Sequence, residues 1–257
     1  MAIDLVFLPA ATILGCVTVL WAISLRLRDA SIADIWWGPG FALIAWVLFL
    51  NTVPTSDRLL LVVALLTAWG LRLGLYLGHR NLGHAEDKRY QAMRRGSPGF
   101  WWISLFKVFY LQGALQLMVA LPVYTIAVSS TSLNWLDVAA SGVAAAGIVL
   151  EATADWQLSR FKRGPDTTHS VLQTGVWGWC RHPNYFGNAL IWLGIGAIAM
   201  AGGAPWWILS GPAVMWFLLL KVSGVSMLER TIVDRRPEYR EYIARVPAFF
   251  PNPFSRR

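Results

Sequence analysis

Long apolar runs separated by short polar segments dominate the chain. Seven runs, at roughly 5–25, 34–51, 58–79, 101–129, 135–156, 184–202 and 205–228, approach or exceed the ~20 residues that cross a bilayer as a helix. Arg26 and Arg28 follow the first run and no basic segment precedes it, so we interpret it as a retained helix. The pattern predicts an all-α, polytopic membrane protein, with residues 1–257 forming a single domain of seven transmembrane helices.

Charged residues fall on one side of this arrangement. Of the 22 Lys and Arg residues, only Arg58 lies near the side that holds the N-terminus and the segments 51–57, 129–134 and 202–205. Because cytoplasmic loops are enriched in Lys and Arg, we expect a periplasmic N-terminus and a cytoplasmic C-terminus. The segments 81–100, 157–183 and 230–257 would then form a cytoplasmic cap. The net charge of +8 needs no nucleic-acid partner under this interpretation.

Neither the cysteines nor the histidines show a metal-binding pattern. Cys16 and Cys180 form no Cys-x-x-Cys motif, and the four histidines lack spacings such as His-Glu-x-x-His. We therefore expect no metal site.

Ionisable residues inside the apolar runs mark candidate sites, because a charge in lipid is costly. Arg72, Tyr76 and Arg80 share one face of the third run, and Arg72 lies roughly 12 Å deeper than Arg80 at 1.5 Å per residue. Trp69 lies near that face. Asp34, at the entry of the second run, is either a helix N-cap or a buried proton donor.

Two further polar groups have alternative interpretations. Glu86, Asp87, Arg89 and Tyr90 form a mixed-charge patch, which is either a solvated loop or a cytoplasmic cap over a polar ligand. Gln112 and Gln116 are four residues apart and suit either contacts between helices or contacts with a substrate.

The second half of the chain concentrates polar and aromatic residues around the stretch 177–188. Glu151 and Asp155 share a helix face just before a basic segment, and Asn184 and Asn188 share another face at the start of the sixth run. The remaining candidates are cations and acceptors near the same side of the membrane: Lys162, Arg163, Arg181, His182, Lys221 and Glu229. Such a set suits a large anionic ligand from the cytosol, either a phosphorylated dinucleotide or S-adenosylmethionine, beside a lipophilic substrate from the membrane.

The stretch Arg181-His182-Pro183-Asn184-Tyr185-Phe186-Gly187, with Asp155-Trp156-Gln157 before it and Glu229 after it, resembles the bacterial branch of the steroid 5-alpha-reductase superfamily. The resemblance implies a seven-helix enzyme of the bacterial inner membrane that uses NADPH to reduce the 4,5 double bond of 3-oxo-4-ene steroids or similar enones. It implies a cofactor site facing the cytoplasm, with these ligands: Arg72, Tyr76, Arg80, Asp155, Lys162, Arg163, Arg181, His182, Asn184, Asn188, Lys221 and Glu229.

The resemblance also implies where the chemistry occurs. Asp34 stands in the region of a Gln-Glu pair of the animal enzymes, and Trp69 replaces a tyrosine three residues before the arginine of the third helix. Asp34 and Trp69 are therefore the catalytic candidates, with Asp34 stabilising negative charge on the carbonyl oxygen. The Arg-His-Pro-Asn-Tyr motif also occurs in membrane methyltransferases of lipids and prenylcysteine. A methyltransferase that uses S-adenosylmethionine is the alternative, and a lipid- or sterol-binding protein without enzymatic activity is a third hypothesis.

Overall fold

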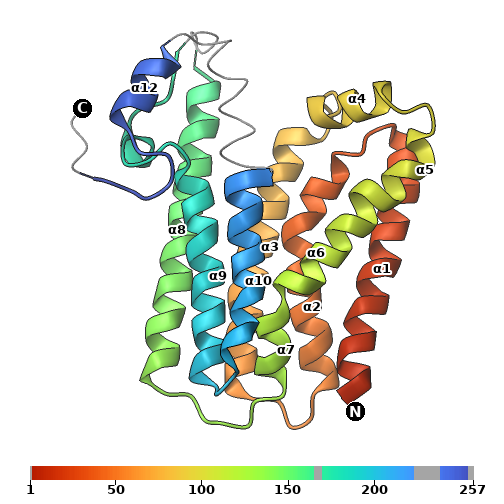
Figure 1. Ribbon diagram of the computed structural model, residues 1–257, viewed down its shortest axis with the longest axis vertical. Coiled ribbons are helices and arrows are strands. Elements are labelled where there is room, and N and C mark those ends of the chain that lie inside the picture. The colour runs from red at the N-terminus through yellow and green to blue at the C-terminus, as the bar shows by residue number, and fades with distance from the viewer. Residues whose placement is uncertain (1, 165–169, 223–237, 254–257) are drawn as a thin grey trace. The chain divides into compact units, whose positions relative to one another are not determined.

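The computed structural model describes residues 2–164, 170–222 and 238–253, and within these ranges every regular element is helical (Figure 1). The long helices are α1 (Ala2–Leu27), α2 (Ile32–Asn51), α3 (Asp57–Asn81), α8 (Trp135–Lys162) and α9 (Pro183–Ala201). The shorter ones are α4 (Lys88–Arg95), α5 (Phe100–Ser104), α6 (Leu111–Val119), α7 (Leu121–Ala127), α10 (Ser210–Phe217) and α12 (Tyr239–Arg245).

Six described segments are long and apolar enough to cross a membrane, which fits a multi-pass membrane protein. They are Leu5–Leu27, Ile32–Asn51, Asp57–Asn81, Phe100–Val119, Trp135–Lys162 and Pro183–Ala201. The seventh predicted span is represented by Trp206–Val222, a shorter apolar helical segment, and residues 223–228 lie outside the described ranges. The count of seven and the orientation stay predictions.

The predicted helix 101–129 is not continuous. Its first part runs through α5, the π-helical turn η1 (Leu105–Tyr110) and α6, and it ends at Val119. A new helix, α7, begins at Leu121 with Pro122 in its first turn. Proline has no N–H for an intrahelical bond and is favoured in the first turn of a helix, where that N–H is not needed, so the position of Pro122 fits a restart there.

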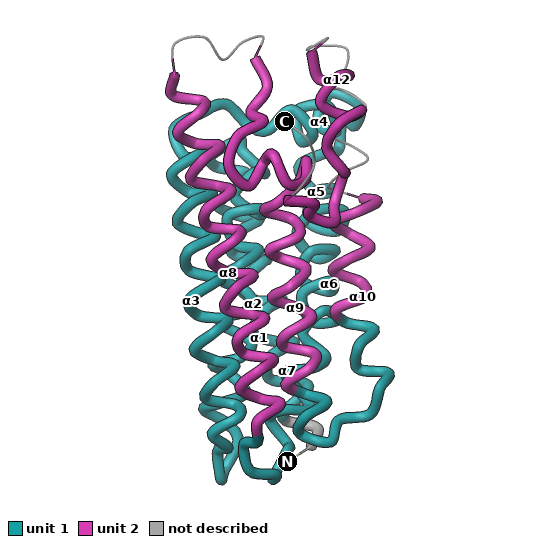
Figure 2. The backbone as a smooth tube through the Cα atoms, turned by 90° about the vertical axis from the view of Figure 1, so that its left-hand side faces the viewer, with its two compact units in different colours: residues 1–134, 199–211 teal, residues 135–198, 212–257 magenta. Residues whose placement is uncertain are grey.

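Two compact units make up the chain (Figure 2). Unit 1 comprises residues 1–134 and 199–211, and unit 2 comprises residues 135–198 and 212–257. In unit 1, α2 and α3 cross at two glycines: a Cβ added at Gly38 would lie 2.7 Å from the Gly70 carbonyl oxygen. Glycine is required at this crossing because the two backbones nearly touch.

In unit 2, α8 and α9 pack through small residues in the same way. A Cβ on Gly187 would lie 2.7 Å from both the Glu151 backbone nitrogen and the Gly147 carbonyl oxygen. Gly194 faces Ala140 and Ala144 further along the same pair of helices. This close approach brings the polar residues of the two helices within hydrogen-bonding reach.

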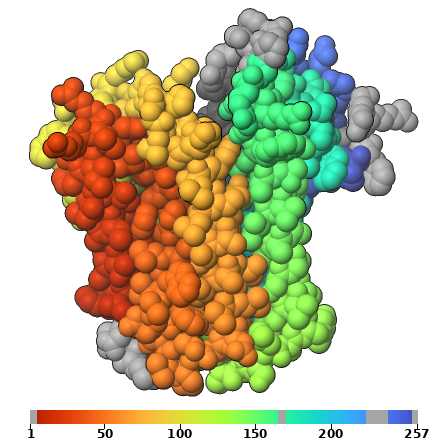
Figure 3. All heavy atoms as spheres, turned by 180° about the vertical axis from the view of Figure 1, so that it is seen from behind, coloured from red at the N-terminus to blue at the C-terminus, as the bar shows by residue number. Residues whose placement is uncertain are grey.

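The helices α1, in red, and α3, in light orange, lie at the surface of unit 1 in the space-filling view (Figure 3). Exposed apolar side chains on these helices include Phe7, Val19, Leu71 and Leu75. Apolar side chains pointing away from the core suit contact with lipid, which supports placing these helices in a membrane.

Arg58, the cation that breaks the charge asymmetry of the sequence, is completely buried in unit 1. Its guanidinium donates to Thr131 Oγ1 at 2.6 Å, to the Thr131 carbonyl at 2.8 Å and to the Ser132 carbonyl at 2.9 Å. The residue therefore ties the first turn of α3 to the segment before α8, which explains its isolated position.

Candidate functional site

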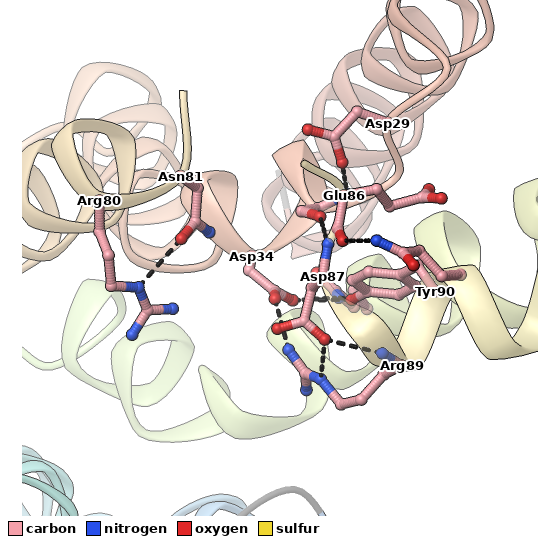
Figure 4. Close-up of polar contacts among 11 residues, drawn as sticks. Asp29, Asp34, Arg80, Asn81, Glu86, Asp87, Arg89 and Tyr90 are labelled. Carbon is pink, nitrogen blue, oxygen red and sulfur yellow. Dashed lines mark hydrogen bonds and ion pairs between the residues drawn. The ribbon is translucent and has the colours of Figure 1, made fainter. Parts of the chain in front are cut away.

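Asp34 lies at the centre of a polar network in unit 1 (Figure 4). Arg89 Nη2 donates to one carboxylate oxygen at 2.7 Å, and the Tyr90 hydroxyl donates to the other at 2.7 Å. Gln112 Nε2 reaches Tyr90 Oη at 3.3 Å and Asp34 Oδ1 at 3.5 Å. Two donors from α4 and one from α6 thus converge on a carboxylate in the first turn of α2.

Asp34 is not the N-cap of α2, and its role as a proton donor stays a prediction. The N-cap position of α2 belongs to Ser31, so Asp34 lies inside the first helical turn. Both oxygens of its carboxylate accept hydrogen bonds, one from Arg89 and the other from Tyr90. Its contacts therefore favour a carboxylate that orients neighbouring groups.

The segment that supplies these donors is fastened to the start of α2. Arg94 makes a bidentate pair with Glu86, at 2.8 and 3.0 Å, and Glu86 Oε1 also accepts from the Ala30 N–H at 2.8 Å. The Asp87 N–H donates to Ser31 Oγ at 2.8 Å, and Asp87 caps α4 by accepting from the Arg89 N–H. The patch therefore contains local ion pairs and packs onto the start of α2, and a role as a cap over a ligand stays a prediction.

The pKa values in this segment follow from its burial and charges. Burial, with the Asp34 charge next in importance, raises the pKa of the Tyr90 hydroxyl well above its ordinary value, so it carries its proton at neutral pH. Burial alone would raise the pKa of Asp87, but the hydrogen bonds and charge of Arg89 outweigh it and lower that pKa. The network therefore contains a neutral phenol between a carboxylate and an amide.

The cations of α3 also belong to unit 1. The Arg80 guanidinium carbon lies 5.8 Å from the centroid of the Tyr76 ring, and Arg80 Nε donates to Asn81 Oδ1. Arg72 is half-buried two turns deeper. Trp69 is fully buried, and the centroid of its ring lies 5.7 Å from that of Phe41 on α2. This ring contact is part of the packing between α2 and α3.

Unit 2 places two carboxylates opposite two asparagines. Asn184 Nδ2 donates to Asp155 Oδ1 at 3.3 Å, and Asn188 Nδ2 donates to Glu151 Oε2 at 3.4 Å. The four-residue spacing on α8 matches the four-residue spacing on α9, so these form two successive rungs. Glu151, Asp155 and Asn188 are buried, and among the described atoms none lies in hydrogen-bonding position to Asn188 Oδ1.

The residues around the start of α9 make two kinds of contact, ring stacking and hydrogen bonds to backbone carbonyls. The His182 and Tyr185 rings are parallel, with centroids 5.5 Å apart. Arg181 donates to the carbonyls of Val246 and Ile243, and Trp177 Nε1 donates to the Ala154 carbonyl. Burial raises the pKa of the Cys180 thiol to about 11, with a smaller opposing effect of the His182 backbone and Arg181.

The remaining predicted ligands lie at the surface or outside the described ranges. Lys162 and Arg163 are exposed at the end of α8, and Lys221 is exposed in the π-helical turn η4 (Leu218–Val222). Glu229 lies outside the described residues. The candidates thus form one set in unit 1 and another in unit 2, and the convergence of both sets on one ligand stays a prediction.

The contacts of Asp34 add Arg89, Tyr90 and Gln112 to the candidate site, beyond the catalytic and cofactor-binding residues predicted from the sequence. Tyr90 lies in a charged segment that the sequence suggests is a loop and that the structure shows as α4. An aromatic ring with a hydroxyl group is its only signal in the sequence, and its contact with Asp34 spans 56 positions. The described ranges contain no group of three or more His, Cys, Asp or Glu residues that could hold a metal ion.

Comparisons with known proteins find a matching family and similar chains. A family model described as "Protein of unknown function (DUF1295)" matches residues 20–246. An uncharacterized protein of Schizosaccharomyces pombe is 29% identical over 267 residues, covering 91% of this chain and 76% of that protein. The cobalt-zinc-cadmium resistance protein CzcN of Cupriavidus metallidurans is 30% identical over 83 residues, covering 32% of this chain and 36% of CzcN. No solved structure matches the chain.

Proposed function

Because the chain belongs to the DUF1295 family, which is related to steroid 5-alpha-reductase-like membrane proteins, we propose that it is an NADPH-dependent reductase of steroid-like enones. The observation that carries this proposal is the pair of rungs in unit 2. They present buried carboxylates and amides with a spare acceptor at Asn188 Oδ1. Acceptors of this kind suit ribose hydroxyls or a carboxamide, since a buried acceptor is costly when unsatisfied.

The proposed cofactor would supply a hydride to the beta carbon of the enone, and protonation of the resulting enolate at the alpha carbon would then give the saturated ketone. Asn184, Asn188 and Asp155 would hold its uncharged polar groups, while Arg72 and Arg80 would balance its phosphates. The exposed Lys162, Arg163 and Lys221 would add positive charge at the cytoplasmic entrance. A lipophilic substrate would enter from the bilayer.

In the same proposal, the substrate carbonyl would be polarised by the unit 1 network. Tyr90 is the better proton donor, because its phenol is neutral while its Asp34 partner accepts from Arg89. Negative charge that develops on the carbonyl oxygen would be stabilised by the Tyr90 O–H, with Gln112 Nε2 as a second donor. Asp34 and Arg89 would orient the phenol.

Thermal shift of the detergent-purified protein with NADPH, NADH and S-adenosylmethionine tests the proposal. We expect NADPH to stabilise the protein by roughly 2.7 kcal/mol at a hundredfold excess over its Kd. Asn188→Ala should reduce this stabilisation, whereas Asn51→Ala, an exposed asparagine that donates to the Val47 carbonyl, should not.

Stabilisation by S-adenosylmethionine alone would favour the methyltransferase hypothesis instead. Stabilisation by none of the three compounds would favour a lipid-binding protein. The substrate class is tested by NADPH oxidation on addition of a 3-oxo-4-ene steroid, with the saturated ketone as the expected product.

A further inference from the structure

The C-terminal segment 238–253, here called the clasp, is bonded to the residues that precede α9. The Asn252 N–H donates to the Trp179 carbonyl at 2.8 Å, and the Tyr242 hydroxyl donates to the Trp177 carbonyl at 2.5 Å. Arg245 Nη2 donates to Gln173 Oε1 at 2.9 Å. Side chains and backbone of the clasp therefore bind residues 173–179.

Arg181 of the Arg-His-Pro-Asn motif makes further contacts with the clasp. Its backbone N–H donates to the Pro247 carbonyl at 2.9 Å, and its Nη1 donates to the Val246 carbonyl at 2.6 Å and the Ile243 carbonyl at 3.2 Å. Because α12 ends at Arg245 with Val246 as its C-cap, the Ile243 and Val246 carbonyls belong to the C-terminal end of a helix, where a cation is favourable. The whole residue is only 8% exposed.

Apolar packing reinforces these bonds. Tyr239, Tyr242 and Val246 form a buried cluster, against which Val171 and Ile243 pack. The Phe249 ring contacts Phe186, in the first turn of α9, with centroids 5.5 Å apart. The clasp thus touches both the stretch before α9 and α9 itself.

We propose that Arg181 is a positioning residue that fastens the clasp to the start of α9, in place of the direct cofactor contact that the sequence suggests. The fastening holds the first turn of α9, which carries Asn184, in a fixed position. The fastening itself stands on the contacts above. Its effect on cofactor affinity rests on the proposed function.

Hydrogen–deuterium exchange of the full-length protein in detergent tests the fastening without any ligand. Arg181→Gln should make amides of residues 238–253 exchange about ten- to a hundredfold faster, as expected for loss of hydrogen bonds from a charged donor. Arg181→Lys, which keeps a cationic donor, should restore part of the protection. Tyr242→Phe should also speed exchange, whereas Arg240→Gln, on the exposed side of α12, should leave it unchanged.

Unchanged exchange in both Arg181→Gln and Tyr242→Phe would overturn the fastening. The second measurement of the test is the affinity of the same variants for NADPH and for NADH. Arg181→Gln should weaken both about tenfold, as expected when a single supporting interaction is lost, and keep their ratio. If Arg181→Gln removes the preference for NADPH over NADH while hydrogen–deuterium exchange of residues 238–253 stays normal, Arg181 contacts the 2′-phosphate directly. This outcome would contradict our proposal. If the parent protein binds neither dinucleotide, the proposed function fails, while the exchange data still decide whether the clasp is fastened.

Discussion

The two polar regions of the molecule are built in different ways. In unit 2, Asp155 and Glu151 meet Asn184 and Asn188 because two helices carry the same four-residue spacing and cross at small residues. In unit 1, Asp34 meets Arg89 and Tyr90 because a separate segment, which includes α4, packs onto the start of α2. The register of α8 against α9 determines the first arrangement. The packing of α4 and the residues before it onto the start of α2 determines the second.

This difference has consequences for stability and chemistry. A register made by two backbones in contact has no room to adjust, so changes at the crossing should affect folding. A loop held by ion pairs and capping bonds can be altered one group at a time while the helices remain folded. Mutations in the Asp34 network of unit 1 should therefore affect mainly activity, and mutations at the α8–α9 crossing of unit 2 mainly stability.

The largest expected effect concerns Tyr90. Tyr90→Phe removes the hydroxyl that is the proposed donor to the carbonyl oxygen, and loss of one such donor lowers kcat by about 10²–10³-fold. Steady-state NADPH oxidation with an enone substrate measures this effect.

Tyr110→Phe is the matched control, because the Tyr110 hydroxyl contacts Thr18 at 3.2 Å. An equal loss of activity in both variants would indicate a general structural effect. Undiminished kcat in Tyr90→Phe would remove Tyr90 from the proposed mechanism.

The second prediction concerns the solvent access of the motif in unit 2. Because burial raises the pKa of Cys180 to about 11, its thiolate is scarce at pH 8, and alkylation should be roughly a hundredfold slower than for an ordinary thiol. Maleimide labelling of a Cys16→Ala variant measures the ratio of the Cys180 labelling rates in the native and the denatured protein. A raised pKa stabilises the folded state below the unfolded thiol pKa, and this contribution is lost as pH rises through about 11. Fast labelling of the native protein at pH 8 would contradict the buried environment.

The third prediction tests the rigidity of the α8–α9 crossing. Gly187→Ala forces a methyl group to within 2.7 Å of backbone atoms of Glu151 and Gly147, so it should destabilise the protein by about 1–3 kcal/mol. Gly142→Ala on α8, where a methyl group would meet no atom within 4 Å, should be neutral or slightly stabilising. Equal thermal stability of the two variants would show that the crossing is adaptable.

The smallest expected effect concerns Asp87. Its lowered pKa means that the charged form stabilises the folded state above the unfolded pKa, and this contribution disappears as pH falls through the lowered value. Because the side chain is 34% exposed, Asp87→Asn should cost less than about 1 kcal/mol. The difference in stability between the parent and this variant should vanish in acid, and a difference that persists there would exclude an electrostatic origin.

The polar residues on α8 and α9 are the part of the candidate site that could be predicted from the sequence. The spacing of 151 and 155, and of 184 and 188, identified the faces that carry the rungs, because helical periodicity is local. The break near Ala120 was missed although Pro122 was visible, because hydropathy continues through the break. Tyr90 was missed as a site residue because nothing local distinguishes a solvated loop from one that packs onto α2.

The sequence by itself determined a helical membrane protein, its apolar runs, and the polar faces of α3, α8 and α9, because each depends on composition and period within one element. Only the tertiary structure decided the partners. It placed Arg89 and Tyr90 on Asp34 and gave Arg181 the carbonyls of Val246 and Ile243. These contacts join positions more than 50 residues apart, and their geometry is set by how whole segments pack.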